Sequence, residues 1–215
     1  MTQQNKSEFV YQEIAQKILT KEFTPGQRLV ERTLIKEFGV SKTPIREAMQ
    51  RLRQDGLLTG DFYHGVQVTR LNKKEAIELL DTLEILVCET TTRAVRIMSD
   101  KDIEDIQQIF NKFEKYLDLG DLNSYIEADV EFHDRIAQCA DNRFLLEALR
   151  RIRLAERLLL TTTAFLPGRG PHVSIEEHRE IMDALIRRDL DAAFCSARKN
   201  VVNSRNAVEK YGALS

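Results

Sequence analysis

The segment GVSKTPIREAMQRLRQDGLL, from Gly39 to Leu58, constrains the fold more than any other part of the chain. It has helical periodicity, because four apolar residues fall at positions i, i+3, i+4 and i+7: Ile45, Ala48, Met49 and Leu52. A proline in the first turn of a helix loses no hydrogen bond, and its fixed φ favours helix initiation. Pro44 therefore marks the start of a helix, which Ser41 or Thr43 can cap.

The segments on either side of this helix predict a winged helix-turn-helix. Apolar residues recur at helical spacing over residues 8–20, and Thr24-Pro25-Gly26 ends that helix. A second short helix stops at Gly39. After Gly56, β-prone segments surround a tip bounded by Gly60 and Gly65. Two helices joined by a tight turn and followed by a hairpin are typical of this fold.

The rest of the chain predicts an all-α bundle of about six helices. The expected helices cover residues 73–98, 99–120, 121–140, 142–165, 174–188 and 189–211. Asn72 and Ser99 are predicted to cap the first two, and Ser174 with Glu177 forms a predicted capping box after the loop LPGRGPHVS. The fold class is therefore mostly α, with a winged helix-turn-helix domain over residues 1–71 and an all-α domain over residues 72–215.

Charge and composition narrow the classes of protein that the chain can belong to. Residues 1–72 carry 11 basic and 8 acidic side chains, a net charge of +3, and the remainder carries −5. A basic N-terminal third is typical of a module that binds a polyanion. There is no apolar run of membrane-spanning length and no secretory pattern at the N-terminus, so we expect a cytoplasmic protein without a membrane partner. The three cysteines are widely spaced and are expected to be reduced.

The polar face of the proline-started helix allows two interpretations. Its residues are Lys42, Thr43, Arg46, Gln50 and Arg53. For an isolated helix, a solvated surface is the commoner explanation of scattered charges. The free N–H groups and positive dipole end of a helix start also suit phosphates, and an arginine on guanine contributes about 1–3 kcal/mol of discrimination. The neighbouring helix, turn and hairpin favour DNA binding.

Over residues 8–70 the chain resembles the DNA-binding domain of the GntR family of bacterial transcription regulators. The matching elements are Pro25-Gly26, Leu29, Leu34, Phe38-Gly39-Val40-Ser41, Thr43-Pro44, Arg46-Glu47-Ala48, Leu52 and Asp55-Gly56-Leu57. The resemblance implies that operator DNA is contacted by Arg32, Ser41, Lys42, Thr43, Arg46 and the wing residue Gly65. Lys42 stands where the family usually has arginine and lacks its bidentate geometry. His64, beside the wing glycine, is either a minor-groove contact or a bystander.

A second candidate site lies in the predicted bundle. Asp129 and His133 are four residues apart and therefore share one helix face, and His178 lies near another helix start. A carboxylate with two imidazoles is a common ligand set for zinc, nickel or manganese. By spacing alone, a hydrogen-bonded Asp–His pair and an unrelated histidine explain the pattern better.

The segments ADVEFHDRIAQCADNRFL and SIEEHREIMDALIRRDLDAAF resemble the FCD domain, the helical effector-binding domain of the FadR-like branch of this family. The resemblance implies that Asp129, His133 and His178 bind a divalent metal, zinc, nickel or manganese. A fourth ligand, histidine in many members, falls at or near Asn200, and an amide oxygen is a weaker ligand for these metals.

The same resemblance implies a pocket for a small carboxylated metabolite, an organic or sugar acid. Arginines on the predicted helices can line that pocket: Arg93, Arg150, Arg153 and Arg157. Surface salt bridges are the alternative role for each. The runs Thr90-Thr91-Thr92 and Thr161-Thr162-Thr163 can supply hydroxyl groups to a polar ligand or serve as small packing residues between helices.

We therefore expect a ligand-responsive transcription regulator that binds a palindromic operator as a homodimer, and not an enzyme. One alternative is a constitutive DNA-binding regulator whose bundle only dimerises. The other is a metal-dependent hydrolase, but the chain has no HExxH, no GxSxG and no glycine-rich phosphate loop.

Overall fold

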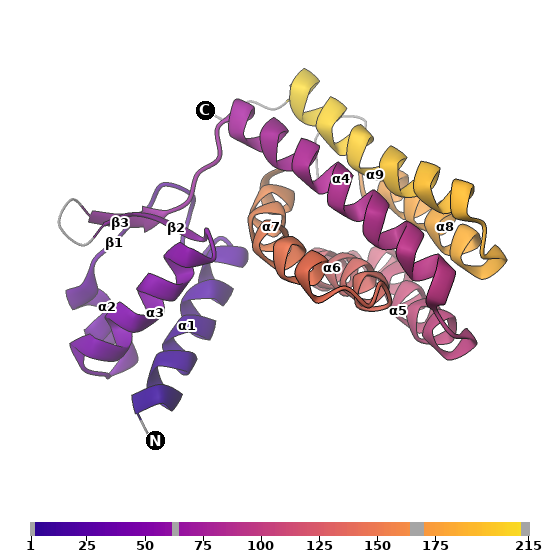
Figure 1. Ribbon diagram of the computed structural model, residues 1–215. Helices are drawn as coiled ribbons and strands as arrows, with labels where there is room; N and C mark the ends of the chain where they lie inside the picture. Colours follow the sequence, from indigo (N-terminus) through magenta and orange to yellow (C-terminus); the bar gives the residue numbers. More distant parts are fainter. Residues whose placement is uncertain (1–2, 62–64, 164–169, 212–215) are drawn as a thin grey trace. The chain divides into compact units, whose positions relative to one another are not determined.

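The computed structural model describes residues 3–61, 65–163 and 170–211, which form two compact units. The first unit is Met1–Arg70 and the second is Leu71–Ser215, one residue before the boundary expected from sequence. The fold is mostly α with one small sheet, as predicted (Figure 1). None of the described helices has the length and apolar character needed to cross a membrane.

Three helices form the body of the first unit: α1 (Gln3–Leu19), α2 (Glu31–Phe38) and α3 (Lys42–Gln54). Helix α1 begins earlier than the periodicity of residues 8–20 indicated. The predicted apolar stripe of α3 is confirmed, because all four of its residues are fully buried. Helix α1 packs on α3 and contributes Val10, Ile14 and Ile18 to the same core.

The start of α3 follows the prediction in one respect and departs from it in another. Pro44 is the third residue of the helix and is buried, so it lies in the first turn as expected. Ser41 occupies the N-cap position, but its side chain makes no capping hydrogen bond, so the expected side-chain cap is wrong. The preceding turn depends on Gly39, whose φ of 64° ends α2 in the left-handed region that glycine adopts without strain.

The wing is a three-stranded antiparallel sheet in the order β1-β3-β2. Strands β2 (Leu58–Asp61) and β3 (Gly65–Val68) form the predicted hairpin, with Leu58 opposite Val68. The third strand, β1 (Arg28–Leu29), was not predicted and pairs Arg28 with Gln67 of β3. His64 lies outside the described residues.

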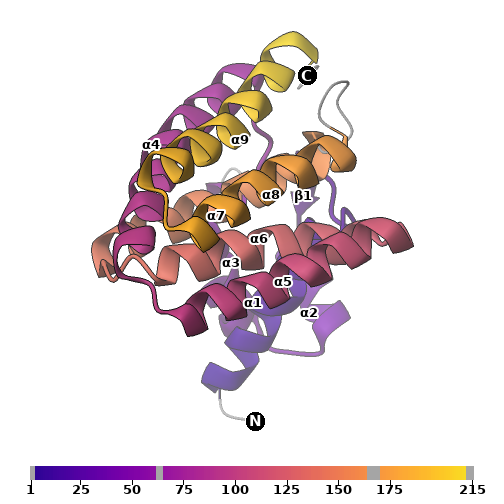
Figure 2. The same cartoon turned by 90° about the vertical axis from the view of Figure 1, so that its right-hand side faces the viewer.

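The second unit contains six described helices: α4 (Lys73–Ile97), α5 (Asp100–Leu119), α6 (Leu122–Gln138), α7 (Arg143–Thr163), α8 (Pro171–Arg187) and α9 (Leu190–Tyr211). Helices α4 and α9 run antiparallel, since the side chain of Lys73 donates to the backbone carbonyl of Glu209. Helix α8 packs on α9 and on α5, and α6 packs on α5 and α7 (Figures 1 and 2). A core that includes Phe110, Phe113 and Phe132 fills the space between α5, α6 and α8.

The helix starts follow local capping chemistry, with one correction. Asn72 and Ser99 form capping boxes, with Glu75 and Asp102 respectively. The predicted capping box of Ser174 is wrong, because α8 begins at Pro171 and Ser174 lies inside its first turn. A proline at the first helical position starts the helix one turn earlier than expected. The end of the predicted helix over 142–165 and most of the loop before Pro171 lie outside the described residues.

Candidate functional site

The start of α3 presents the cationic group expected from sequence. Its side chains remain in solvent, with Lys42 59% and Arg46 47% exposed, and Ser41 and Thr43 are exposed as well. Arg32, on α2, is also exposed. This arrangement leaves a helix N-terminus, two cations and two hydroxyl groups accessible to a polyanion.

Both cations share one carboxylate, which the sequence interpretation missed. Arg46 donates from Nε to Oε1 of Glu31 at 2.7 Å, and Nζ of Lys42 lies 3.5 Å from Oε2 of the same residue. Glu31 is the first residue of α2 and its side chain is 22% exposed. The contact joins residues 15 apart across the helix-turn-helix, so no local spacing rule could reveal it.

The wing depends on a glycine at position 65. Gly65 has a φ of 108°, which side-chain-bearing residues rarely adopt, and a Cβ placed there would lie 2.6 Å from Nε of Arg28. The exposed Arg28 side chain therefore lies directly against the wing backbone. Sequence reasoning named Gly65 but missed Arg28, because β1 was not expected.

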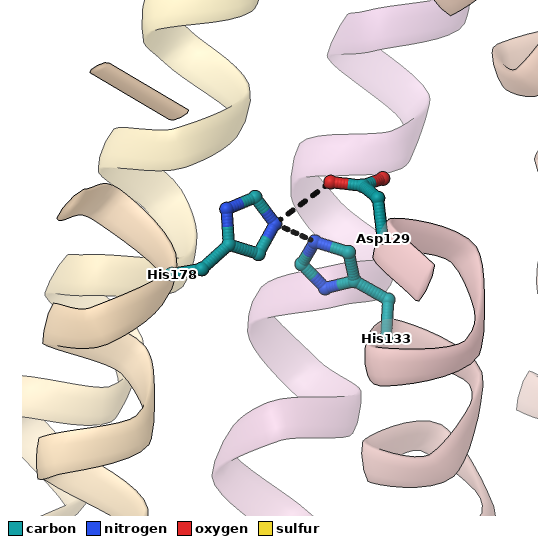
Figure 3. Close-up of side chains that lie close together, drawn as sticks. All are labelled: Asp129, His133 and His178. Carbon is teal, nitrogen blue, oxygen red and sulfur yellow. Dashed lines mark hydrogen bonds and ion pairs between the residues drawn. The ribbon is translucent and has the colours of Figure 1, made fainter. Parts of the chain in front are cut away.

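In the helical unit, α6 and α8 bring Asp129, His133 and His178 together. One ligand atom from each side chain lies within 4.8 Å of the other two, and all three residues are buried (Figure 3). Asp129 and His133 lie one turn apart on α6, and His178 projects toward them from α8. The helix spacing and the third histidine therefore converge on one point, as a metal centre requires.

The hydrogen bonds of His178 show what the three side chains can hold. Its Nδ1 lies 2.6 Å from the backbone carbonyl oxygen of Ser174, so Nδ1 carries the proton. Nε2 lies 2.9 Å from Oδ1 of Asp129 and 2.9 Å from Nε2 of His133. In the neutral ring Nε2 carries a lone pair that faces a carboxylate oxygen of Asp129. Two such electron-rich atoms repel each other, so the arrangement requires a cation between them, either a proton or a metal ion. A histidine that donates its other N–H to a carbonyl is the usual second contact of a metal-binding imidazole. The residues therefore fit a divalent metal.

The charge state of Asp129 is consistent with a cation site. Burial raises the pKa of its carboxyl group, but the charge and hydrogen bond of His178 and the charges of His133 and Arg153 outweigh burial and hold the pKa well below its usual range. Asp129 is thus a carboxylate, the form that binds a metal ion.

Asn200 is buried on α9, where its amide nitrogen donates to Oε2 of Glu177 at 3.0 Å. Asn203 donates to the other oxygen of Glu177 at 2.6 Å. The amide at the position where the resemblance implies a fourth ligand is therefore engaged by a buried carboxylate from α8. The three ligand atoms that the structure groups come from Asp129, His133 and His178.

The predicted effector arginines differ in their surroundings. Arg153 is only 6% exposed and donates to Glu156 at 2.6 Å, and its charge acts on Asp129. Arg157 pairs with Glu127, and Arg93 lies 3.7 Å from Glu89. Within the described part of the chain, the buried Nε atoms of Arg93, Arg153 and Arg157 have no hydrogen-bond partner. Arg150 is exposed on α7.

Neither the threonine hydroxyl groups of α4 nor a cavity on α8 and α9 adds a group to the predicted effector pocket. Thr90 and Thr92 donate to carbonyl oxygens of their own helix, which fits the packing role. The side chains of Thr161–Thr163 lie outside the described set. A cavity of about 270 Å³ lies on α8 and α9, and neither the three grouped ligands nor the effector arginines line it. Its lining residues are Glu180, Asp183, Arg187, Ala192, Cys195, Ser196 and Lys199.

The fold and these residues define a class: a winged helix-turn-helix protein with a separate helical domain that contains a buried Asp-His-His group. Comparison with known families agrees with both halves. Residues 6–68 match the family described as "Bacterial regulatory proteins, gntR family", and residues 78–201 match the family described as "FCD domain". The chain belongs to the GntR family of bacterial regulators, in the branch with a C-terminal FCD domain.

Relatives of similar length support this assignment. The HTH-type transcriptional regulator YdhC of Bacillus subtilis is 27% identical over 194 residues, which cover 85% of this chain and 82% of that protein. The HTH-type transcriptional repressor RspR of Escherichia coli is 24% identical over 196 residues, 89% and 85% of the two chains. The protein is therefore a transcriptional regulator, and the hydrolase alternative is wrong.

Solved structures share the fold. The Escherichia coli protein McbR/YncC superposes with a TM-score of 0.82 at 18% identity, and the match covers 95% of this chain and 97% of that chain. At this identity the likeness shows the architecture, a winged helix-turn-helix with a helical C-terminal domain.

Proposed function

We propose that the protein binds a palindromic operator as a homodimer and that a small carboxylated metabolite in the helical domain changes its affinity for DNA. The observation that carries the DNA half is the exposed cationic start of α3 in a chain of the GntR family. In this proposal α3 enters the major groove, with Arg46, Lys42, Thr43, Ser41 and Arg32 contacting DNA and Gly65 at the wing. A DNA target places the protein in the cytoplasm.

The helical half of the proposal combines a metal ion with buried cationic groups. Asp129, His133 and His178 would hold a divalent ion, zinc, nickel or manganese, which supplies a Lewis acid for a carboxylate ligand. Arg153 lies close enough for its charge to act on Asp129, and its buried Nε lies 3.7 Å from Oδ1 of Asp134 but makes no hydrogen bond among the described residues. A buried donor that makes no hydrogen bond is costly, so an anion bound within hydrogen-bond distance would stabilise this group. We propose the same role for Nε of Arg93, with Arg150 at the pocket entrance.

The homodimer is supported by apolar side chains on the outer helices of the bundle. Ile85 on α4, Ile186 on α8 and Phe194 on α9 are 71%, 51% and 45% exposed. Large apolar groups that remain exposed on neighbouring helices are typical of a surface that a partner covers. Two-fold symmetry of the protein would match a palindromic site.

The DNA half is tested with Arg46→Ala. The probe is the duplex that the wild-type chain selects from a random-sequence library. We expect the variant to bind this duplex more weakly by about 1–3 kcal/mol, or about 5- to 150-fold, because it loses a base-reading arginine. Arg53→Ala is the matched control: it removes the same charge two turns further along α3, where we assign no base contact.

The two variants distinguish a base contact of Arg46 from a general effect of removing one positive charge. The proposal for Arg46 predicts a larger loss of affinity on the selected duplex than on the random one. If Arg46→Ala and Arg53→Ala weaken binding to the selected and random duplexes equally, α3 does not read sequence through Arg46.

The metal half is tested by measuring the metal content and zinc affinity of the purified full-length chain. Replacing one of three ligands should lower affinity by at least about 10–100-fold, the effect typical of losing even a supporting contact, so His133→Ala should lose its metal. His172→Ala is the control, since His172 lies outside the grouped ligands. Equal metal content in wild type and His133→Ala would rule out this ligand set.

A further inference from the structure

Glu31 is placed where a carboxylate is unfavourable for simple DNA affinity. It is the first residue of α2, and its two oxygens face the two cations at the start of α3. Oε1 accepts from Nε of Arg46 at 2.7 Å and Oε2 lies 3.5 Å from Nζ of Lys42. A negative charge this close to a phosphate-binding helix start repels the DNA backbone.

Stability alone does not account for this contact. Arg46 and Lys42 are about half exposed, and ion pairs between exposed side chains contribute about 0–1 kcal/mol. The position of Glu31 at the start of α2 is favourable for its own helix through the helix dipole, but that effect does not require either cation. The shared carboxylate therefore has its main consequence for the two cations.

The contact between Arg46 and Glu31 is made through the nitrogen nearest the aliphatic stem of the arginine. This hydrogen bond uses Nε, the inner nitrogen of the guanidinium group, whereas a guanine edge is read by two parallel N–H groups. A guanidinium anchored at Nε has its plane and direction fixed, so less side-chain entropy is lost when it meets a base.

We propose that Glu31 is a positioning residue that sets DNA specificity: it orients Arg46 for base reading, and its charge weakens binding of Arg46 and Lys42 to phosphates of any sequence. This inference rests on the proposed role of Arg46. Glu31 thereby widens the gap between specific and non-specific DNA, the quantity that determines occupancy of an operator among many competing sites.

The experiment measures the affinity of the full-length chain for two duplexes of equal length at several salt concentrations. One is the duplex that the wild type selects from a random library, and the other has random sequence. The variants are Glu31→Ala and Glu31→Gln, each alone and with Arg46→Ala. Glu37→Ala is the matched control, because it removes the same charge from α2 but from a pair with Lys17.

For Glu31→Ala we expect the ratio of selected to random affinity to fall about 10-fold or more, with weaker binding to the selected duplex and unchanged or tighter binding to the random one. Glu31→Gln retains an acceptor for Nε but no charge. Its ratio should fall only about 3-fold, entirely through tighter random binding with a steeper salt dependence. Glu37→Ala should keep the ratio within about twofold of wild type, as a remote surface charge does.

Four results would overturn the inference. One is an equal loss on both duplexes with a lower melting temperature, which indicates a purely structural role. Another is a fall in the ratio for Glu31→Ala that persists undiminished in the Arg46→Ala background, since coupled residues must show non-additivity. A ratio unchanged in Glu31→Ala while Arg46→Ala lowers it defeats this inference alone. A ratio unaffected by Arg46→Ala defeats the proposed base contact and, with it, the role of Glu31.

Discussion

A single proton decides the chemistry of the buried group at His178. Because Nδ1 donates to the carbonyl oxygen of Ser174, Nε2 is directed at Asp129 and His133 as a ligand atom. The sequence placed Asp129 and His133 on one helix face by their spacing of four. Spacing could not place His178 beside them, since no local pattern connects α6 with α8, and only the resemblance to the FCD domain grouped the three residues. Glu31 contacts the start of α3 and Arg28 contacts the wing backbone at Gly65. Both contacts join different elements, so the neighbouring sequence gave no indication of either one.

The contribution of a single carboxylate to stability can be tested at Asp102. It closes the capping box of α5, where its carboxylate accepts hydrogen bonds from the Ser99 hydroxyl, from Arg135 and from the Ser99 backbone. These bonds hold its pKa well below the usual range. At neutral pH we expect Asp102→Asn to lower the free energy of unfolding by about 1–2 kcal/mol, the size of a lost cap plus a partly exposed ion pair.

The pH dependence of that difference follows from the direction of the pKa shift. A carboxyl group with a lowered folded-state pKa contributes fully above its unfolded pKa of about 4 and loses the contribution as pH falls below that value. The gap between wild type and Asp102→Asn should therefore shrink toward pH 3 in urea unfolding. Asp118→Asn, an exposed acid at the other end of α5, should cost nothing. A gap that is constant from pH 7 to pH 3 would contradict the assigned ionic role.

At the scale of elements, starts and stops encoded by neighbouring residues were predictable. Asn72 and Ser99 cap their helices as expected, and Gly39 ends α2. Two elements show where local rules fail. Strand β1 has two residues and exists through its pairing with β3, and the start of α8 is set by Pro171 in place of the capping pair expected one turn later.

The link between α8 and α9 yields a prediction about Asn200. Replacing it with alanine removes one amide donor from the buried carboxylate of Glu177, so the free energy of unfolding should fall by about 1–3 kcal/mol. Metal content should stay at the wild-type level, because the Asn200 amide is hydrogen-bonded to Glu177 and the metal would be held by Asp129, His133 and His178. Asn206→Ala, at an exposed site on α9, is the stability control. Loss of metal in Asn200→Ala would show that the amide acts as a fourth ligand after all.

At the scale of the whole molecule, the two units differ in net charge. Residues 1–72 carry a net charge of +3 and the rest carry −5, which is consistent with one unit for a polyanion and another for a different ligand. The sequence predicted this division and the fold of both units, because helical periodicity, turn residues and the family resemblance pointed to the same architecture. The small-molecule ligand that we propose for the helical unit could not be deduced from sequence in the same way, because the groups that would bind it come from side chains that only the fold brings together.

Whether the protein reads DNA sequence can be measured as the ratio of its affinities for a selected and a random duplex. Full-length wild-type protein is titrated with the selected duplex and with a random duplex of equal length, at about 150 mM salt and at several other concentrations. We expect an affinity ratio of about 1,000 or more, with the random duplex showing a salt dependence that reflects phosphate contacts alone. A ratio near one, with the same steep salt dependence for both duplexes, would contradict this expectation.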